Sequence, residues 1–277
     1  MKTVGVFDSG FGGLTVLREL LRLVPDARYV YLGDTARLPY GSKSRETIAR
    51  YAISSARFLA EQGAELLVIA CNTATALAID DIRAALPIPV IGVVEPGALA
   101  ALSAAQASPR GVEKSEVMVL ATSATTQSRA YSRSLSAAGL RSTEKACPLL
   151  VPIVEEGWLE QPAQKAVALE VLRIYLLEAL EKAPGANILL LGCTHYPLLK
   201  PLIEATLKTL HHPMHIIDSA AATAGAVASL LSTKSSTTGT GPELTFYATD
   251  SIEKFQRLGS TFLNQPLHEV HLVDLGG

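Results

Sequence analysis

The sequence predicts an α/β fold of two doubly wound domains, each built on a mostly parallel sheet. Short runs of valine, leucine and isoleucine alternate with longer segments whose apolar residues recur every three or four positions, as in residues 14–24. Several short runs are apolar on both faces, which is typical of parallel strands that helices cover from both sides. Alternation of this kind implies right-handed strand–helix–strand crossovers.

The expected elements follow this alternation along the chain. Each strand is a run of apolar residues that ends at a small, polar or ionisable residue, at 3–8, 28–34, 65–71, 88–94, 115–121, 187–193, 214–218, 244–249 and 268–273. Each helix is a periodic segment between two such runs, at 13–24, 43–62, 74–86, 97–107, 124–138, 163–182, 198–210, 219–231 and 251–263. These strands exceed what one small sheet needs, so we expect two sheets, with the chain crossing near Pro96-Gly97. The Ser/Thr/Gly-rich stretch 232–243 is expected to be an exposed loop.

Composition excludes several classes of protein. The chain has 277 residues, 48% of them hydrophobic, which is enough for one or two buried cores. A net charge of −2 without a basic run argues against nucleic-acid binding. No stretch has the length of a signal core or of a membrane span. The three cysteines form no close pair, which favours reduced thiols. We therefore expect a soluble cytoplasmic protein.

Polar residues gather where the expected strands end. In doubly wound sheets the ligand crevice lies beyond the carboxyl ends of the strands. Those ends are Asp8-Ser9-Gly10, Asp34-Thr35, Cys71-Asn72-Thr73, Glu95-Pro96, Ala121-Thr122-Ser123 and Cys193-Thr194-His195. The turn "DSGFGG" (8–13) matches neither a P-loop nor a dinucleotide fingerprint. Asp8 favours the binding of a cationic group such as an amine over a purely structural turn.

Two cysteines stand at equivalent places. Cys71 and Cys193 each follow a buried strand and precede hydroxyl or amide side chains and a helix. A helix N-terminus lowers the pKa of a thiol from about 8.5 and makes the thiolate accessible. Cys147, in "ACPLLVP", is instead interpreted as a small buried hydrophobe. The repeated strand–cysteine–polar turn also suggests two halves related by pseudo-symmetry.

Other chemistries compete for these residues. His195 beside Cys193 could ligate zinc, but four ligands at workable spacing cannot be assembled, and the histidines of "LHHPMH" (210–215) fall on a connecting loop. We therefore expect no metal. A thiol hydrolase using Cys193 and His195 is a more serious rival, although it leaves Cys71 without a role. A ligand-binding protein that needs neither thiol is a third possibility.

Two matched thiols suit the inversion of a stereocentre that carries a proton α to a carboxylate. Inversion needs a base on one face and an acid on the other, and a reversible reaction favours two groups of the same kind. Hydrogen-bond donors must then stabilise the developing enediolate-like charge. Asn72, Thr73 and Thr194 follow the cysteines directly and are placed for that role.

Six blocks together resemble the glutamate racemases, cofactor-independent enzymes of the aspartate/glutamate racemase superfamily. They are "GVFDSGFGGLTVL", "YLGDTARLPYG", "ACNTATALA", "VIGVVEPG", "ATSATTQSRAY" and "LGCTHYPLL". They cover the chain from residue 4 to about 218, with weaker similarity in "FYATD". The combination of "CNTA", "GCTHYP" and "DSGFGG" is specific to the glutamate branch.

The resemblance implies roles for individual residues. Cys71 and Cys193 match the catalytic acid/base pair, and Asp8 is expected to handle the ammonium group of the substrate. His195 and Glu155 match catalytic auxiliaries, although the adjacent Glu156 is an alternative to Glu155. The remaining substrate contacts are expected at Ser9, Tyr40, Gly41, Asn72, Thr73, Thr194 and, in a block that departs from the usual Gly-Thr start, Thr122 and Thr125.

The resemblance also implies the function and the architecture. We expect an isomerase that interconverts L- and D-glutamate without pyridoxal phosphate or metal and supplies D-glutamate for peptidoglycan and cell wall biogenesis, and hence cell shape. An aspartate racemase or another member of the superfamily is the alternative. One domain is expected to combine 1–95 with 212–277 and the other to span 96–211, with the active site in the cleft between them. We expect a homodimer. The chain begins directly at its first strand, so activation by a cell-wall precursor through an N-terminal extension is not expected.

Overall fold

The fold is described from a computed structural model over residues 2–231 and 242–276. The chain divides into two compact units, one formed by Met1–Val93 with Ala220–Gly277 and the other by Val94–Ser219. Each unit contains a parallel sheet flanked by helices, so the predicted α/β class is confirmed. Within the described ranges, no helix is long and apolar enough to cross a membrane.

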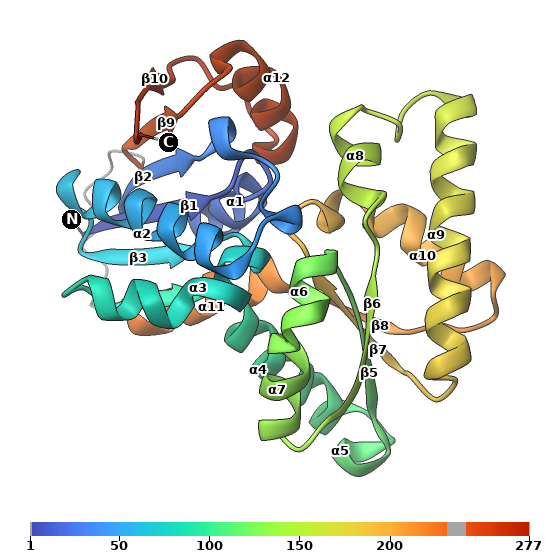
Figure 1. The fold of residues 1–277 in the computed structure, drawn as a ribbon. Coiled ribbons are helices and arrows are strands. Elements are labelled where there is room, and N and C mark those ends of the chain that lie inside the picture. Colours follow the sequence, from blue (N-terminus) through green and yellow to red (C-terminus); the bar gives the residue numbers. More distant parts are fainter. Residues whose placement is uncertain (1, 232–241, 277) are drawn as a thin grey trace. The chain divides into compact units, whose positions relative to one another are not determined.

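The first unit holds six parallel strands among its described residues, in the order β10-β9-β2-β1-β3-β4 (Figure 1). They are β1 (Thr3–Asp8), β2 (Arg28–Gly33), β3 (Leu66–Ile69), β4 (Val90–Gly92), β9 (Leu244–Ala248) and β10 (His271–Leu272). Every residue of β1 and β3 is buried, as expected for strands covered on both faces. The carboxyl ends of β1 and β3 therefore lie side by side and carry Asp8 and Cys71.

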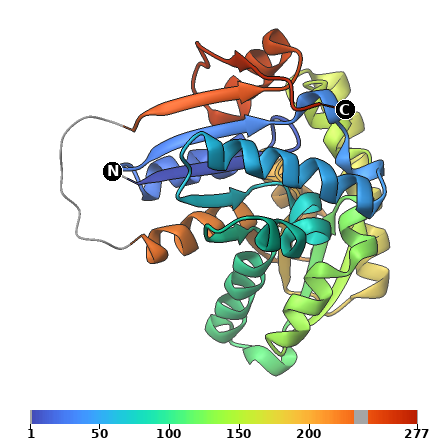
Figure 2. The same ribbon diagram turned by 60° about the vertical axis from the view of Figure 1, so that its left-hand side comes forward.

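Helices cover both faces of this sheet. They are α1 (Leu14–Leu23), α2 (Arg45–Glu61), α3 (Asn72–Ala85), α11 (Ser219–Leu230) and α12 (Ile252–Leu263), with short 3₁₀ turns η1 (Thr35–Arg37) and η2 (Tyr40–Ser42). The β1-to-β2 and β2-to-β3 connections run in opposite directions across the sheet, so right-handed crossovers put α1 and α2 on opposite faces. Figure 2 shows α2 and α3 together on one face. Phe7, Leu67 and Ile69 pack there against these helices.

The second unit holds four parallel strands in the order β6-β5-β7-β8 among its described residues. They are β5 (Glu116–Ala121), β6 (Arg141–Ala146), β7 (Ile188–Gly192) and β8 (His215–Asp218). The helices are α4 (Val94–Ala107), α5 (Gly111–Lys114), α6 (Ser123–Ser128), α7 (Ala130–Ala137), α8 (Leu150–Glu155), α9 (Pro162–Lys182) and α10 (Lys200–Thr209), with the 3₁₀ turn η3 (Tyr196–Leu199). α4 packs with α7 on one face, and α9 packs with α10 on the other (Figure 1).

The structure differs from the sequence expectations in several places. The chain returns to the first unit at Ala220 rather than near residue 212, because β8 pairs with β7. Pro96-Gly97 lies inside α4, where proline is tolerated in the first turn, and the crossing comes just before it. The helix expected at 124–138 is broken at Arg129, whose φ of 55° is left-handed. Most of the loop expected at 232–243 lies outside the described residues.

Candidate active site

Asp8 and Cys71 lie at the ends of neighbouring strands in the first unit. The register pairs Phe7 of β1 with Ile69 of β3, so the residues that follow both strands emerge at the same sheet edge. The Sγ of Cys71 lies 3.4 Å from the Oγ of Ser9. The thiol donates to this oxygen when it is protonated, and the hydroxyl donates to the sulfur when it is a thiolate. This contact joins two of the predicted site residues.

Cys71 also caps a helix. It occupies the N-cap of α3, and its Sγ accepts a hydrogen bond from the backbone N–H of Ala74 at 3.4 Å. The free N–H groups and the dipole of a helix N-terminus favour negative charge at this point. Asn72 and Thr73 form the first turn of the same helix and are buried. The local sequence therefore places a thiol, an amide and a hydroxyl at one positive helix end.

The glycine-rich turn holds the carboxylate of Asp8. Asp8 is 1% exposed, and its Oδ2 accepts a hydrogen bond of 2.8 Å from the N–H of Gly10. A Cβ on Gly13 would lie 2.5 Å from the Cβ of Asp8, so the turn packs against this side chain without room for a larger residue. The turn is therefore both a tight connection into α1 and the support of a buried negative charge.

Tyr40 and Gly41 belong to a segment that a buried ion pair fixes. The carboxylate of Asp34, which is fully buried, accepts hydrogen bonds from Arg37 Nε at 2.7 and 2.8 Å, from the hydroxyl of Tyr40, and from Thr249 Oγ1 at 3.0 Å. Burial, and then the charge of Asp34, raise the pKa of Tyr40 well above its usual value. The phenol of Tyr40 is therefore bonded to Asp34, and its side chain is buried within the unit.

In the second unit, Cys193 is followed by a short chain of hydrogen-bonding groups. The Nδ1 of His195 lies 3.9 Å from the Sγ of Cys193 and 3.3 Å from the Oγ1 of Thr194. Its Nε2 lies 3.0 Å from the Oε1 of Glu155, which ends α8. An ionised carboxylate can only accept, so Nε2 carries a proton and Nδ1 is the atom that exchanges one. Glu156 is exposed and Glu155 supplies the contact.

These contacts determine the charge of His195. Burial disfavours the imidazolium, but hydrogen bonds to Cys193 and then to Glu155 outweigh it and raise the pKa of His195 from 6.5 to about 10. A protonated imidazole beside Cys193 stabilises the thiolate and can return a proton to it. The arrangement suits a sulfur that alternates between base and acid.

Thr122 and Thr125 lie next to this group. The register pairs Ala121 of β5 with Gly192 of β7, so Thr122 and Cys193 follow adjacent strand ends. Thr122 caps α6 by accepting from the N–H of Thr125 at 3.4 Å, and its hydroxyl bonds that of Thr125 at 3.0 Å. The cap orients both hydroxyls at the sheet edge that carries Cys193.

Cys147 has a different environment. It is fully buried, burial raises its pKa well above the usual range, and its carbonyl accepts a 2.9 Å hydrogen bond from Tyr196. These features fit its interpretation as a packing residue. In the part of the chain that is described, no cluster of three potential ligands could hold a metal ion. His212 of the "LHHPMH" segment bonds the carbonyl of Ala186 at 2.7 Å.

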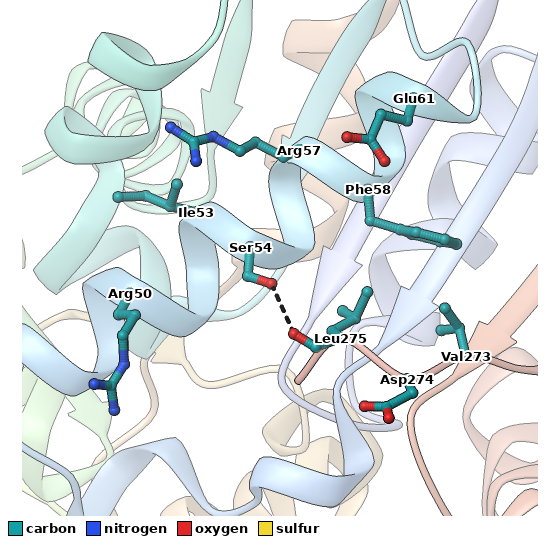
Figure 3. A pocket seen from close by; sticks show the side chains of 9 residues that line it. All are labelled: Arg50, Ile53, Ser54, Arg57, Phe58, Glu61, Val273, Asp274 and Leu275. Atoms are coloured by element: carbon teal, nitrogen blue, oxygen red, sulfur yellow. Dashed lines mark hydrogen bonds between the residues drawn. The ribbon is translucent and has the colours of Figure 1, made fainter. Parts of the chain in front are cut away.

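A separate cavity of about 780 Å³ lies between α2 and the C-terminal segment (Figure 3). Its lining contains none of the predicted site residues and comprises Arg50, Ile53, Ser54, Arg57, Phe58, Glu61, Val273, Asp274 and Leu275. The Oγ of Ser54 donates to the carbonyl of Leu275 at 3.4 Å across it. Two arginines and two carboxylates line the cavity together, so their charges balance and favour neither an anionic nor a cationic ligand. Because none of the predicted site residues lines it, this cavity is not part of the candidate site.

Comparison with known proteins identifies the family. Residues 4–227 match the Asp/Glu/Hydantoin racemase family. The chain belongs to this family. It is 49% identical to a glutamate racemase of Koribacter versatilis, over 99% of this chain and 98% of that protein. The resemblance to glutamate racemases inferred from the sequence blocks is thereby confirmed.

Solved structures of family members share the fold. A glutamate racemase isoform of Bacillus anthracis is 34% identical and superposes with a TM-score of 0.86, covering 99% of this chain and 98% of that one. A glutamate racemase of Francisella tularensis in complex with D-glutamate is 33% identical, with a TM-score of 0.83 over 99% and 98% of the two chains. The near-complete coverage shows that both units belong to the family fold.

Within each unit, the structure gathers the residues predicted from the sequence. Asp8, Ser9, Cys71 and its capped helix form one group, and Cys193, Thr194, His195 and Glu155 form the other. Sequence reasoning missed the carboxylate of Asp34, which accepts hydrogen bonds from Tyr40, Arg37 and Thr249. The available signals were the polar strand end at Asp34 and the weakly similar block "FYATD", which contains Thr249.

Proposed function

We propose that the chain interconverts L- and D-glutamate by 1,1-proton transfer, with Cys71 and Cys193 as the two acid/base groups. The observation that carries the proposal is the pair of buried thiols at equivalent strand ends, each held against a proton-exchanging neighbour. The identity of 49% with a glutamate racemase supports glutamate over aspartate as the substrate. The complex of the Francisella protein with D-glutamate supports binding of the same small molecule here.

The reaction requires both thiols to reach one Cα from opposite sides. One cysteine, as thiolate, takes the Cα proton, and the bond electrons pass into the carboxylate as an enediolate-like anion. The other cysteine, as thiol, returns a proton to the opposite face and becomes the thiolate. The reverse reaction exchanges the two roles, so no net proton is gained or lost.

Other side chains complete the proposed chemistry. The buried carboxylate of Asp8 binds the substrate ammonium group, and Asn72, Thr73 and Thr194 provide hydrogen bonds to its carboxylates and to the anion. Ser9, the backbone of Tyr40 and Gly41, Thr122 and Thr125 are the remaining contacts. His195, held by Glu155, serves the thiol of Cys193 alone.

We also propose that the reaction needs no cofactor, because the two thiols supply both proton transfers. Activity should persist after exhaustive dialysis against a chelator, and the purified protein should lack pyridoxal absorbance. Dependence on an added metal or on pyridoxal phosphate contradicts this part of the proposal.

The biological role that we propose is the supply of D-glutamate for peptidoglycan in a bacterial cytoplasm. None of Cys71, Cys147 and Cys193 is in a disulfide, and the two catalytic thiols must stay reduced, as they do in a cytoplasm. Expression of the chain should rescue a bacterial strain that requires added D-glutamate. A Cys71→Ser variant, expressed to the same level, is the matched control and should not rescue it.

Incorporation of solvent deuterium at Cα is the decisive test. In D₂O, L-glutamate and D-glutamate should each acquire deuterium as they racemise, whereas aspartate run in parallel should not. Deuteration of aspartate alone favours the aspartate racemase alternative. Hydrolysis without exchange favours the thiol hydrolase, for which Cys193, His195 and Glu155 would suffice. Binding without exchange would reduce the chain to a ligand-binding protein.

A further inference from the structure

Two tyrosines of β2 bond the two ends of α1. Tyr29 and Tyr31 are two residues apart, so their side chains leave the same face of the sheet, and both are fully buried. The hydroxyl of Tyr29 donates to the carbonyl of Val24 at 2.7 Å, where α1 ends. The hydroxyl of Tyr31 donates to the carbonyl of Gly10 at 3.1 Å, in the turn that precedes α1. The second of these bonds therefore reaches the turn that holds Asp8.

The carbonyl of Gly10 is fixed against β2. Gly10 is buried, and within the described ranges its carbonyl accepts no hydrogen bond other than the one from Tyr31. A Cβ on Gly33 would lie 2.4 Å from the carbonyl oxygen of Gly10, so this oxygen packs directly on the backbone of β2. Tyr31 thus supplies the donor to a buried acceptor, and a buried acceptor without a donor is costly.

Gly10 connects the hydroxyl of Tyr31 to the carboxylate of Asp8. The N–H of Gly10 donates to the Oδ2 of Asp8 at 2.8 Å, while its carbonyl accepts from Tyr31. Two hydrogen bonds on either side of one Cα therefore join the phenol to the carboxylate. Because glycine has the widest choice of backbone angles, Gly10 can turn its N–H away from Asp8 when its carbonyl is not held. The bond from Tyr31 removes that freedom.

The phenol of Tyr31 is placed to act through Gly10 and not on a substrate. It has no exposed surface, and its ring centroid lies 6.0 Å from that of Phe255 and 6.3 Å from that of Phe246. Burial, and then the charges of Asp8 and Cys71, raise the pKa of Tyr31 well above its usual value. The hydroxyl therefore stays protonated at neutral pH and remains a hydrogen-bond donor.

We propose that Tyr31 is a positioning residue that holds the carboxylate of Asp8, through Gly10, in the orientation that binds the substrate ammonium group, which rests on the binding role proposed for Asp8. The ammonium group contacts Asp8 before and during proton transfer, so this interaction stabilises the bound substrate and the transition state alike. Loss of an interaction of this kind raises KM and leaves kcat nearly unchanged. A change at either thiol instead lowers kcat, so the two kinds of effect are separable.

Tyr31→Phe tests the proposal, with Tyr29→Phe as its matched control. Each change removes one buried hydroxyl from the same face of β2, but Tyr29 bonds the far end of α1, which has 10 residues and is about 15 Å long. Steady-state racemisation should show that Tyr31→Phe raises KM for glutamate about 3- to 10-fold and keeps kcat within about 2-fold of the parent. Tyr29→Phe should leave both constants unchanged. Urea titrations show that both variants are folded.

An unchanged KM in Tyr31→Phe overturns the proposal, as does an equal rise of KM in both tyrosine variants, which indicates a general loosening of the fold. Asp8→Asn separates this failure from a failure of the proposed function. Because it removes the charge itself, it should weaken glutamate binding, measured by calorimetry, more than Tyr31→Phe does. If Asp8→Asn weakens binding and Tyr31→Phe does not, the positioning role of Tyr31 fails alone. If Asp8→Asn binds glutamate as the parent does, the proposed role of Asp8 fails and that of Tyr31 fails with it.

Discussion

The two candidate catalytic cysteines occupy equivalent positions but have different neighbours. Cys71 caps the 14-residue helix α3 and contacts a hydroxyl, that of Ser9. Cys193 precedes only the 3₁₀ turn η3 and contacts His195, which Glu155 holds. Negative charge on the first sulfur is therefore favoured by backbone dipoles, and on the second by an imidazolium. Neutral groups thus favour the thiolate of Cys71 in the first unit, whereas a charged imidazole favours the thiolate of Cys193 in the second.

The largest effect should come from removing either thiol. Cys71→Ser and Cys193→Ser should each lower the racemisation kcat by at least roughly 10²–10⁴-fold, because a hydroxyl is too weak an acid to replace a thiol as a general base. Cys147→Ser, a change at the packing cysteine, should leave the chemical step unchanged if the variant folds. Steady-state racemisation followed by circular dichroism measures all three.

One-sided chemistry sharpens this comparison. Elimination from a glutamate analogue with a β leaving group needs only the first proton abstraction. By resemblance to the family, Cys71 should serve D-glutamate and Cys193 L-glutamate. Cys71→Ser should therefore retain elimination from the L-analogue alone, and Cys193→Ser from the D-analogue alone. Loss of the same enantiomer by both variants would place the two thiols on one face and end the two-sided mechanism.

Proton abstraction by Cys193 should be sensitive to changes at His195 and Glu155. His195→Asn should lower the rate of proton abstraction by Cys193 by about 10–100-fold and affect abstraction by Cys71 less, because the imidazole contacts only the former sulfur. Glu155→Gln should give a smaller loss of the same sign. Glu156→Gln, a change at the exposed neighbour, is the control and should have no effect. Pre-steady-state exchange of each enantiomer in D₂O separates the two abstractions.

In the first unit, substrate binding should depend on the segment around η2, which the buried carboxylate of Asp34 holds in place. Tyr40→Phe removes one donor from the buried carboxylate of Asp34, at a cost of about 1–3 kcal/mol in unfolding free energy. Because η2 is proposed to offer its backbone to glutamate, KM should rise more than kcat falls. Thr249→Val removes another donor to the same carboxylate and should act in the same direction. A kcat loss with KM unchanged would contradict a positioning role for this loop.

The sequence predicted the ends of the strands better than the short elements and long-range hydrogen bonds that hold the site residues in place. Apolar runs such as β1 and β7 are recognisable as strands from the sequence alone, so the positions of Asp8 and Cys193 at their ends follow directly. β6, with the sequence RSTEKA, was missed because it is a half-exposed edge strand without an apolar run. α8 was missed because it is only six residues long, yet it positions Glu155. Pairings such as Asp34 with Thr249 join residues far apart in sequence and have no local signal.

The raised pKa of His195 predicts that the stability of the fold depends on pH. The folded pKa of about 10 is higher than the unfolded value of 6.5, so protonation stabilises the fold. This contribution is complete below about pH 6.5 and is lost as the pH rises toward about 10. The parent should therefore lose more unfolding free energy than His195→Asn across this window, on the order of 1 kcal/mol or more. Urea titrations of both proteins at several pH values measure the difference, and parallel curves would contradict it.

The smallest effect should come from the hydroxyl beside Cys71. Ser9→Ala removes the oxygen that lies 3.4 Å from the sulfur, but the N–H of Ala74 and the end of α3 still favour the thiolate. A single neutral hydrogen bond contributes about 0.5–1.5 kcal/mol, so proton abstraction by Cys71 should slow by only about 2- to 10-fold. Abstraction by Cys193 should be unchanged, and Ser9→Thr, which keeps the hydroxyl, should restore most of the rate. This loss is smaller than that of His195→Asn because a hydroxyl carries no charge, whereas the imidazolium does. If Ser9→Ala slowed its own thiol more than His195→Asn slows Cys193, Ser9 rather than the helix end would be the main support of the Cys71 thiolate.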